Sequence, residues 1–514
     1  MIQRAQRTTR HGTIRTRVAI GVLAVALAVM VQPPRLAGQL APAPMEVMPA
    51  ARAAAFVDAA ASGIDYLPGE VVVKFRDGVT PARQQRALDA VRSRPPVDAL
   101  EWIGEVAVLR DASQPDATIL AEQLSAQPEV LYAEPNYLRR HDSTPNDTGY
   151  GPRQWNLQAL DMPKAWDINP GAGTGIIVAV VDTGVTTENT TRTVATWNGS
   201  AIQTITVAYA TNPDLAASRL VSPMDFVTNG GSTVLDSDGH GTHVSSTVGE
   251  DTNNALLDAG IAYNARIMPV KVCTSYWDVQ FAFSAAGGRG FVPPKSGGCP
   301  TSAVGAGIRY AADNGAKIIN LSLGGSSPST TEQDAITYAV GKGVFVAIAA
   351  GNEKLTGNPV HYPASYAAAI DGAMAVGATN RSGNRAAYSN TGTYVEIAAP
   401  GGDSQDSDAS GNGFVWQSTI RPSLSDPSAV IFPRFDAYAE VGYTGTSMAA
   451  PHVAGIAALL SAQGITTPSA IEQLIRKTAK FLGTASASDA NRSDDFGFGL
   501  IQPRPALFGY GIRK

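Results

Sequence analysis

The sequence is poor in cysteine, in net charge and in long apolar runs. Cys273 and Cys299 are the only cysteines among 514 residues, which excludes a multiply bridged scaffold and leaves one disulfide or two free thiols. A net charge of −5 gives no reason to expect a nucleic acid or an anionic membrane as partner. The apolar run 18–31 would span about 21 Å as a helix, short of the roughly 30 Å core of a bilayer. We therefore expect no stable membrane anchor.

The amino terminus has the features of an exported protein. A basic segment, "MIQRAQRTTRHGTIRTR", has five arginines and no acidic residue, and it precedes the apolar run and then small residues. This order is typical of a signal peptide, so we predict one over residues 1–38 and a secreted or periplasmic protein, with an uncleaved anchor as the alternative. The Ala- and Pro-rich stretch 39–66 predicts a loose linker.

Residues 67–138 predict a small domain of their own. Their apolar patterns follow the order strand, helix, strand, strand, helix, strand, which is the ferredoxin-like α+β arrangement. No cluster of catalytic residue types occurs in it, so by pattern alone it is a binding module or a folding aid. Residues 139–153 are polar and rich in turn formers, which predicts an exposed linker open to processing by a protease.

The remainder of the chain, residues 154–507, has an α/β pattern, and 508–514 are expected to be a tail. Short apolar runs alternate with helical segments, which predicts a parallel sheet covered by helices on both faces. The expected strands are 175–182, 265–272, 316–323, 343–350, 372–378 and 394–401. The expected helices are 241–250, 302–314, 332–342, 447–463 and 468–479.

Three polar residues stand next to apolar runs, where parallel sheets gather their sites. Asp182 ends "GIIVAVVD", Asn352 follows "VAIAAG", and Ser447 opens a helix of small residues. Taken singly, each has an ordinary explanation, as a turn aspartate, a turn asparagine and a helix N-cap serine. Pro451 is compatible with this helix because we expect it in the first turn, where backbone amides have no helical partner.

The segment "DGHGTHV" contains His240 and His243, and the pair alone suits metal ligands, core residues or a catalytic base. A metal-dependent hydrolase would need a third clustered ligand, which the sequence does not offer. Together with Asp182 and Ser447, His240 completes a set for nucleophilic acyl transfer. Asn352 would help to stabilise the oxyanion, and His243 is then expected to be a packing residue. A catalytically inactive binding scaffold is the third alternative.

Five segments closely resemble the signature segments of the subtilisin-like serine peptidases, the subtilase family. They are "VAVVDTGV", "DGHGTHVSSTVG", "IINLSLGG", "VAIAAGNE" and "GTSMAAPHVAG", in the order of the family. The resemblance places Asp182, His240 and Ser447 in the catalytic triad and Asn352 in the oxyanion hole. It implies a three-layer α/β fold with a seven-stranded parallel sheet and endopeptidase activity. Residues 67–138 resemble the inhibitory propeptide of the family, which the enzyme removes autocatalytically.

The resemblance also indicates where a substrate binds. "SLGG" matches the stretch whose backbone pairs with an extended substrate and forms one wall of the main specificity pocket, and "AAG" matches the opposite wall. Recognition by strand addition fits a protein or peptide substrate better than a small molecule. "HYPASY" matches a segment that often contains a cis peptide bond, so Pro363 is expected to be cis. The substrate-binding residues so assigned are Ser322, Leu323, Gly324, Ala349, Ala350 and Gly351.

The chain departs from the family pattern in three places. Ser245 and Ser246 stand where the family usually has Ala-Gly, which is expected to shift the helix of the catalytic histidine slightly. Long insertions over 185–235 and 273–299 are expected to reshape the rim of the substrate cleft. The second insertion begins and ends at the two cysteines, so we expect a disulfide there, with two free thiols as the alternative.

No cofactor is expected for catalysis. The family implies structural calcium, for which Asp236, Asp238 and Asp251 are candidate ligands by composition only. The sequence as a whole predicts a secreted serine endopeptidase that removes its own propeptide, an intramolecular inhibitor. We expect a monomer that acts on proteins or peptides. The preferred substrate and the processing site within 138–153 do not follow from the sequence.

Overall fold

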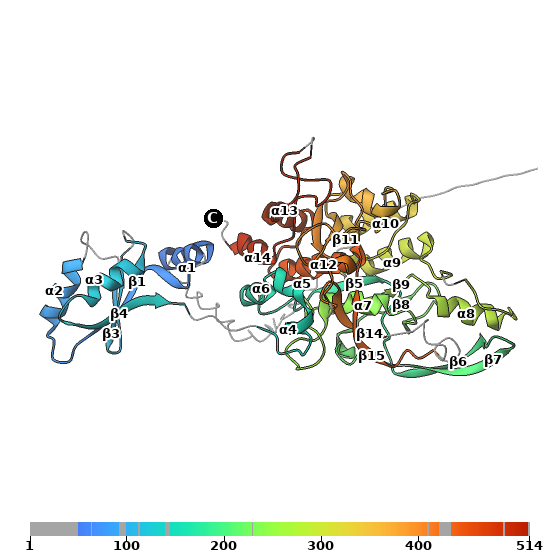
Figure 1. Cartoon of the computed structure of the whole chain (residues 1–514), viewed down its shortest axis with the longest axis horizontal. Coiled ribbons are helices and arrows are strands. Elements are labelled where there is room, and N and C mark those ends of the chain that lie inside the picture. Colours follow the sequence, from blue (N-terminus) through green and yellow to red (C-terminus); the bar gives the residue numbers. More distant parts are fainter. Residues whose placement is uncertain are drawn as a thin grey trace, which may run out of the picture. The chain divides into compact units, whose positions relative to one another are not determined.

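The chain divides into two compact units, residues 1–139 and 140–514, seen in a computed structural model (Figure 1). The structure describes residues 50–62, 64–91, 99–111, 114–138, 144–228, 230–293, 295–408, 411–420, 433–486 and 489–511. The predicted signal peptide lies outside these residues. Within them, no helix has the length and apolar character needed to cross a bilayer.

The first unit has the predicted ferredoxin-like order. Its antiparallel sheet, in the strand order β2-β3-β1-β4, packs an apolar face against two helices. These elements are β1 (Tyr66–Phe75), α2 (Pro81–Val91), β2 (Ala99–Ile103), β3 (Val106–Arg110), α3 (Ala117–Ser125) and β4 (Val130–Tyr137).

The predicted linker 39–66 is wrong over its second half. Residues Ala50–Ser62 form helix α1, with the sequence "AARAAAFVDAAAS". The reason is that the prolines of this stretch end at Pro49, and alanine has the highest helix propensity of all residues. The processing linker and the tail also contain helices: α4 (Tyr150–Arg153) lies in the first, and α14 (Pro503–Gly511) continues past residue 507.

The second unit is built on a seven-stranded parallel sheet, as the resemblance implies. The strand order is β13-β12-β11-β10-β5-β9-β8, with every pair parallel. Six strands lie within three residues of their predicted bounds. The seventh, β8, lies in the insertion 185–235 and is too short to give a sequence pattern. The strands are β5 (Ile177–Asp182), β8 (Met224–Asp225), β9 (Arg266–Lys271), β10 (Ile318–Leu321), β11 (Phe345–Ala349), β12 (Ala373–Thr379) and β13 (Ile397–Pro400).

Helices cover both faces of this sheet (Figure 1). One face packs against α7, α12 and α13 in the larger apolar core, and the other packs against α9 and α10 in a second core. The five predicted helices lie within two residues of their expected bounds. They are α7 (His240–Gly249), α9 (Thr301–Asp313), α10 (Thr330–Gly341), α12 (Thr446–Ala462) and α13 (Pro468–Thr478). The shorter helices are α5 (Trp155–Ala159) and α6 (Met162–Ile168).

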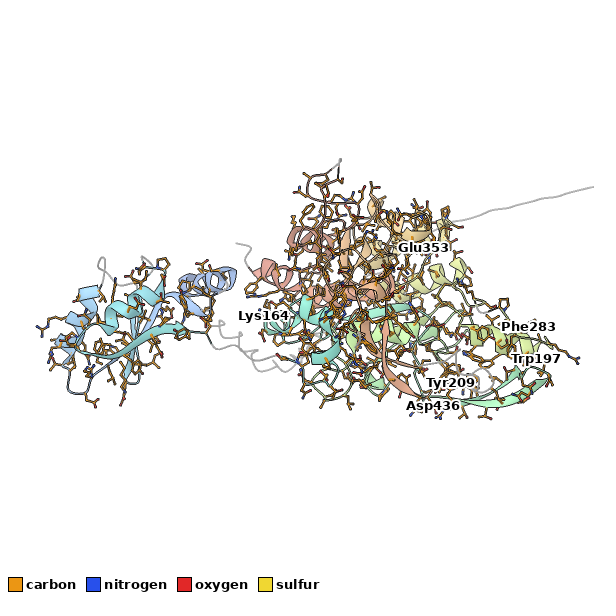
Figure 2. The ribbon with its side chains drawn as sticks, viewed as in Figure 1. Lys164, Trp197, Tyr209, Phe283, Glu353 and Asp436 are labelled. Atoms are coloured by element: carbon orange, nitrogen blue, oxygen red, sulfur yellow. A yellow bond between two sulfur atoms is a disulfide. The ribbon has the colours of Figure 1, made fainter. Side chains whose placement is uncertain are left out.

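The two insertions fold together into an accessory layer with a small core of its own. Strands β6 (Thr190–Trp197) and β7 (Ile202–Tyr209) form a hairpin that packs on α8 (Tyr276–Ala285). Figure 2 labels one residue from each of these elements, Trp197 of β6, Tyr209 of β7 and Phe283 of α8. The predicted disulfide between Cys273 and Cys299 is confirmed. A further hairpin, β14 (Val415–Ile420) with β15 (Tyr438–Tyr443), was not predicted from the sequence.

Candidate active site

Asp182 ends β5, a central strand of the sheet, and its side chain is 1% exposed. Its Oδ1 atom accepts hydrogen bonds from the Thr183 backbone N–H at 2.7 Å and from Nδ1 of His240 at 2.8 Å. A buried carboxylate with two such donors is held in one orientation. It therefore fixes the His240 tautomer with hydrogen on Nδ1 and leaves Nε2 free to accept a proton.

The turn before α7 places His240 as the first residue of the helix. Gly239 has φ 98°, and a Cβ there would lie 2.8 Å from the Ile420 carbonyl oxygen, so only glycine fits. Asp236 closes the turn, because its carboxylate accepts the backbone N–H groups of Asp238, Gly239 and Thr242. The tight spacing of "DGHG" is therefore the local means of pointing His240 at the carboxyl end of β5.

The electrostatics favour a strongly basic imidazole. Burial lowers the pKa of His240, but the charge of Asp182 and its hydrogen bond outweigh this effect and raise the pKa to about 9. Asp238 contributes in the same direction, and its own pKa is raised to about 6 by burial and by Asp236. The His240 side chain is 28% exposed, so a substrate has access to it.

Ser447 lies in the first turn of α12, beside Asn352. Oδ1 of Asn352 accepts hydrogen bonds from the backbone N–H of Thr446 at 2.9 Å and from its hydroxyl at 3.0 Å. The amide group is thereby oriented, and its NH2 remains available to another acceptor. The Ser447 hydroxyl donates to the Ser322 carbonyl at 3.3 Å rather than to His240. Catalytic hydrogen bonds are often loose without substrate, and a rotation of the serine side chain changes this bond.

His243 is fully buried one turn along α7 from His240. Its Nε2 atom lies 3.2 Å from the Val415 carbonyl oxygen and 3.0 Å from that of Val441, and its ring stacks on Tyr443. The Nε2 atom of His243 is thus committed to these two carbonyls and does not serve as a metal ligand. His243 is the packing and hydrogen-bonding residue that the sequence predicts.

The two predicted substrate-binding segments lie side by side at the carboxyl ends of neighbouring strands. Ser322–Gly324 follow β10, and Gly351 follows β11, whose last residue is Ala349. Both glycines face one imidazole, since a Cβ on Gly324 or on Gly351 would lie 2.3 or 2.6 Å from the His361 ring. Next to that ring, the Tyr362–Pro363 peptide bond is cis, as expected.

The candidate calcium ligands all have hydrogen-bond partners within the protein, and the Asp238 carboxylate accepts the His240 backbone N–H at 3.2 Å. Asp236 is committed to the turn before His240, and Asp251 pairs with Arg219 and accepts the Ala216 N–H. In the described part of the chain, no group of three or more His, Cys, Asp or Glu side chains is placed to hold a metal ion.

The serines that replace Ala-Gly in α7 are both fully buried. The Ser246 hydroxyl donates to the Ser418 carbonyl at 3.0 Å and accepts from Nδ2 of Asn212 at 3.1 Å. The Ser245 hydroxyl is buried without a hydrogen-bond partner. Ser246 thus ties α7 to β14 and to the segment after the β6–β7 hairpin.

Sequence reasoning missed a buried ion pair behind the site. Lys271 is the β9 partner of Asp182 in the sheet, and its Nζ lies 2.8 Å from Oδ2 of Asp278 in α8. The same carboxylate group accepts the Ser237 hydroxyl at 2.7 Å, from the turn before His240. The accessory layer is therefore bonded to the turn that carries the imidazole. The signal in the sequence was a lysine within the apolar run "ARIMPVKV".

Comparisons with known proteins agree with this arrangement. A model described as "Subtilase family" matches residues 173–499, and one described as "Fervidolysin N-terminal prodomain" matches residues 52–136. The "Thermophilic serine proteinase" of Bacillus sp. (strain AK1) is 34% identical over 422 residues, which cover 82% of this chain and 84% of that protein. The "Extracellular protease" of Xanthomonas campestris pv. campestris is 33% identical over 476 residues, 85% of this chain and 72% of that protein.

A solved structure of proteases from Pseudoalteromonas arctica PAMC 21717 covers 71% of this chain and 99% of its own, with a TM-score of 0.51 and 29% identity. The matched family model covers most of the α/β unit and all four of the sequence segments around Asp182, His240, Asn352 and Ser447. The chain belongs to the subtilase family of serine endopeptidases and carries a prodomain of the fervidolysin type.

Proposed function

We propose that this serine endopeptidase cleaves proteins with Ser447 as nucleophile, His240 as general base and acid, and Asp182 as the group that orients the imidazole. Nε2 of His240 takes the hydroxyl proton as the Ser447 oxygen attacks the scissile carbonyl, and then returns it to the leaving amine. The Asn352 side-chain NH2 and the Ser447 backbone N–H stabilise the oxyanion. Water then hydrolyses the acyl-enzyme by the same proton transfers.

The observation that carries this proposal is the 2.8 Å hydrogen bond between the buried Asp182 carboxylate and His240. This hydrogen bond holds the His240 imidazole in one tautomer and makes it more basic. The test is to treat the purified protein with a phosphonylating reagent and to compare Ser447→Ala with Ser461→Ala, a serine near the other end of the same helix. We expect labelling and turnover to be lost only in Ser447→Ala. Casein cleavage by a purified Ser447→Ala protein would overturn the proposal.

We further propose that the enzyme removes its prodomain autocatalytically, at a bond before Asp147. The Asp147 side chain is buried and accepts the backbone N–H groups of Asn253 and Asn254, and the Gly149 N–H donates to the Leu257 carbonyl. Residues from 147 onward thus belong to the folded α/β unit, and a cut within them would break buried hydrogen bonds.

Amino-terminal sequencing of mature protein tests this boundary. We expect the mature chain to begin between residues 139 and 147, and a start beyond Gly149 would contradict the proposal. Ser447→Ala should remain at precursor length. Addition of wild-type enzyme to that precursor separates the two routes, since cleavage only in the mixed sample means that processing can also occur between molecules.

Secretion is the remaining part of the proposal. It is supported by the signal-peptide pattern of residues 1–38 and by the name of the Xanthomonas relative, an extracellular protease. Fusion of residues 1–38 to a reporter that is active only outside the cytoplasm tests it, with Arg-to-Glu changes in the basic segment as control.

We also propose that the enzyme binds structural calcium, to be tested by the melting temperature of phosphonylated enzyme with and without a chelator. We further propose that it is a monomer, to be tested by light scattering.

A further inference from the structure

Pro451 does not lie in the first turn of its helix, as the sequence suggested. Helix α12 begins at Thr446, so Pro451 is an interior residue. In a regular helix the N–H of residue 451 would donate to the carbonyl of Ser447, but proline has no N–H. The helix therefore leaves free the backbone carbonyl of the residue that we propose as nucleophile. Proline is the least favourable residue in a helix interior, so its presence there calls for a specific reason.

The free carbonyl is occupied by a side chain from another element. The Ser322 hydroxyl, 4% exposed as a residue, donates to the Ser447 carbonyl at 2.7 Å. That hydroxyl in turn accepts from Nδ2 of Asn320, a fully buried residue of β10, at 2.9 Å. Because a serine hydroxyl has a single proton, the Asn320 donor directs this proton toward Ser447.

A second bond runs in the opposite direction, from the Ser447 hydroxyl to the Ser322 carbonyl at 3.3 Å. The start of α12 and the end of β10 are thus joined by two hydrogen bonds, although 125 residues separate Ser322 from Ser447 in the chain. The bond to the nucleophile's own hydroxyl must break when His240 takes the proton. The bond from the Ser322 hydroxyl to the backbone persists, so it holds the nucleophile through the reaction.

We propose that the Ser322 side chain is a positioning residue for the nucleophile, and that Pro451 keeps the Ser447 carbonyl free for it. This role rests on Ser447 being the nucleophile. It differs from the role that the family resemblance gives to Ser322–Gly324, which is exerted by the backbone on the substrate. Attack requires the reacting atoms to be held within a fraction of an ångström. Loss of this tether, the hydrogen bond from the Ser322 hydroxyl to the Ser447 carbonyl, therefore slows acylation more than it weakens substrate binding.

The test is a double-mutant cycle of Ser322→Ala and Pro451→Ala. We expect Ser322→Ala to lower kcat about 10- to 100-fold with KM within about twofold, because the substrate-binding backbone is unchanged. Pro451→Ala in the Ser322→Ala background should recover part of the lost kcat, because the introduced alanine has a backbone N–H that can donate to the Ser447 carbonyl. The matched control is Ser245→Ala, which removes a buried hydroxyl that has no hydrogen-bond partner and should leave kcat unchanged.

Phosphonylation counts the active sites of each variant, so a poorly folded fraction does not enter kcat, and the pre-steady-state burst gives the acylation rate. Ser322→Thr keeps the hydroxyl and should retain more activity than Ser322→Ala. A kcat for Ser322→Ala within twofold of the wild-type value, or losses that simply add in the double mutant, would overturn the proposal. Activity of Ser447→Ala would instead overturn the proposed function beneath it, so the two failures are distinguishable.

Discussion

Replacing His243 with alanine should lower stability, whereas replacing His240 should abolish turnover and leave the fold intact. The buried His243 ring donates to the Val415 and Val441 carbonyls and stacks on Tyr443 at a centroid distance of 4.5 Å. Loss of the donor leaves buried carbonyls unpaired, at about 1–3 kcal/mol. Loss of the ring adds a cavity and removes the stacking, at about 2 kcal/mol together. We therefore expect His243→Ala to cost about 3–5 kcal/mol.

The pH dependence provides a second readout. Burial lowers the pKa of His243 from its ordinary 6.5 to about 3. Between pH 6.5 and pH 3, His243 is therefore protonated in the unfolded chain but neutral in the folded chain. Its contribution to stability is complete above pH 6.5 and is lost as the pH falls toward 3. Between pH 6.5 and pH 5 the loss is about 2 kcal/mol. The penalty of His243→Ala should be smaller at pH 5 than at pH 7 by about that amount.

The assay is urea unfolding, at both pH values, of precursors that also carry Ser447→Ala, which prevents processing and self-digestion, whereas kcat is measured in proteins that keep Ser447. His240→Ala is the matched control from the same helix. Its loss leaves the buried Asp182 carboxylate without its imidazole partner, so we expect the variant to keep the native fold at reduced stability, with a loss of kcat of about 10⁴-fold or more. A stable His243→Ala variant with a large loss of kcat would refute the assignment of the two histidines.

Three further predictions concern the surroundings of the site. Asp238→Asn should lower the pKa of His240 and move the acid limb of the kcat/KM profile to lower pH, because a charge that favours imidazolium is removed; an unchanged limb would contradict this. Replacing both cysteines with serine should lower the unfolding free energy by about 3 kcal/mol in the chain-entropy model, measured against oxidised wild type, and a negligible change would contradict it. Lys271→Met should lower the free energy of unfolding by about 3 kcal/mol, because it leaves the Asp278 carboxylate without its cation. Adding Asp278→Asn should recover part of that loss, and losses that simply add would show that the pair is not coupled.

The sequence alone was sufficient for the central sheet, the helices on its faces and the four proposed catalytic residues. These features could be predicted because apolar runs and helical periodicity occur within short stretches of consecutive residues. The turn before His240 is local in the same sense, since Asp236 and Gly239 close it through the backbone of their own neighbours. The ferredoxin-like order of the first unit was readable for the same reason.

Features that depend on partners far apart in the chain were not readable. The two-residue strand β8 exists only because β9 pairs with it. Helix α1 was missed for a local reason, because an Ala/Pro composition suggested a linker. The ion pair of Asp251 with Arg219 was not readable either, because 32 residues separate the two side chains in the chain. The sequence shows which residues are charged but not which residue each one pairs with, and that partner determines the role of the charged side chain.

The sequence by itself determined that a serine, a histidine, an aspartate and an asparagine stand at strand ends and helix starts in the subtilase order. Only the tertiary structure decided how they are held. The Ser447 carbonyl is free because Pro451 lacks an N–H, but its donor comes from Ser322, 125 residues earlier. Hydrogen bonds join groups by distance in space and not by position along the chain, so the tether of the nucleophile could be recognised only in the folded molecule.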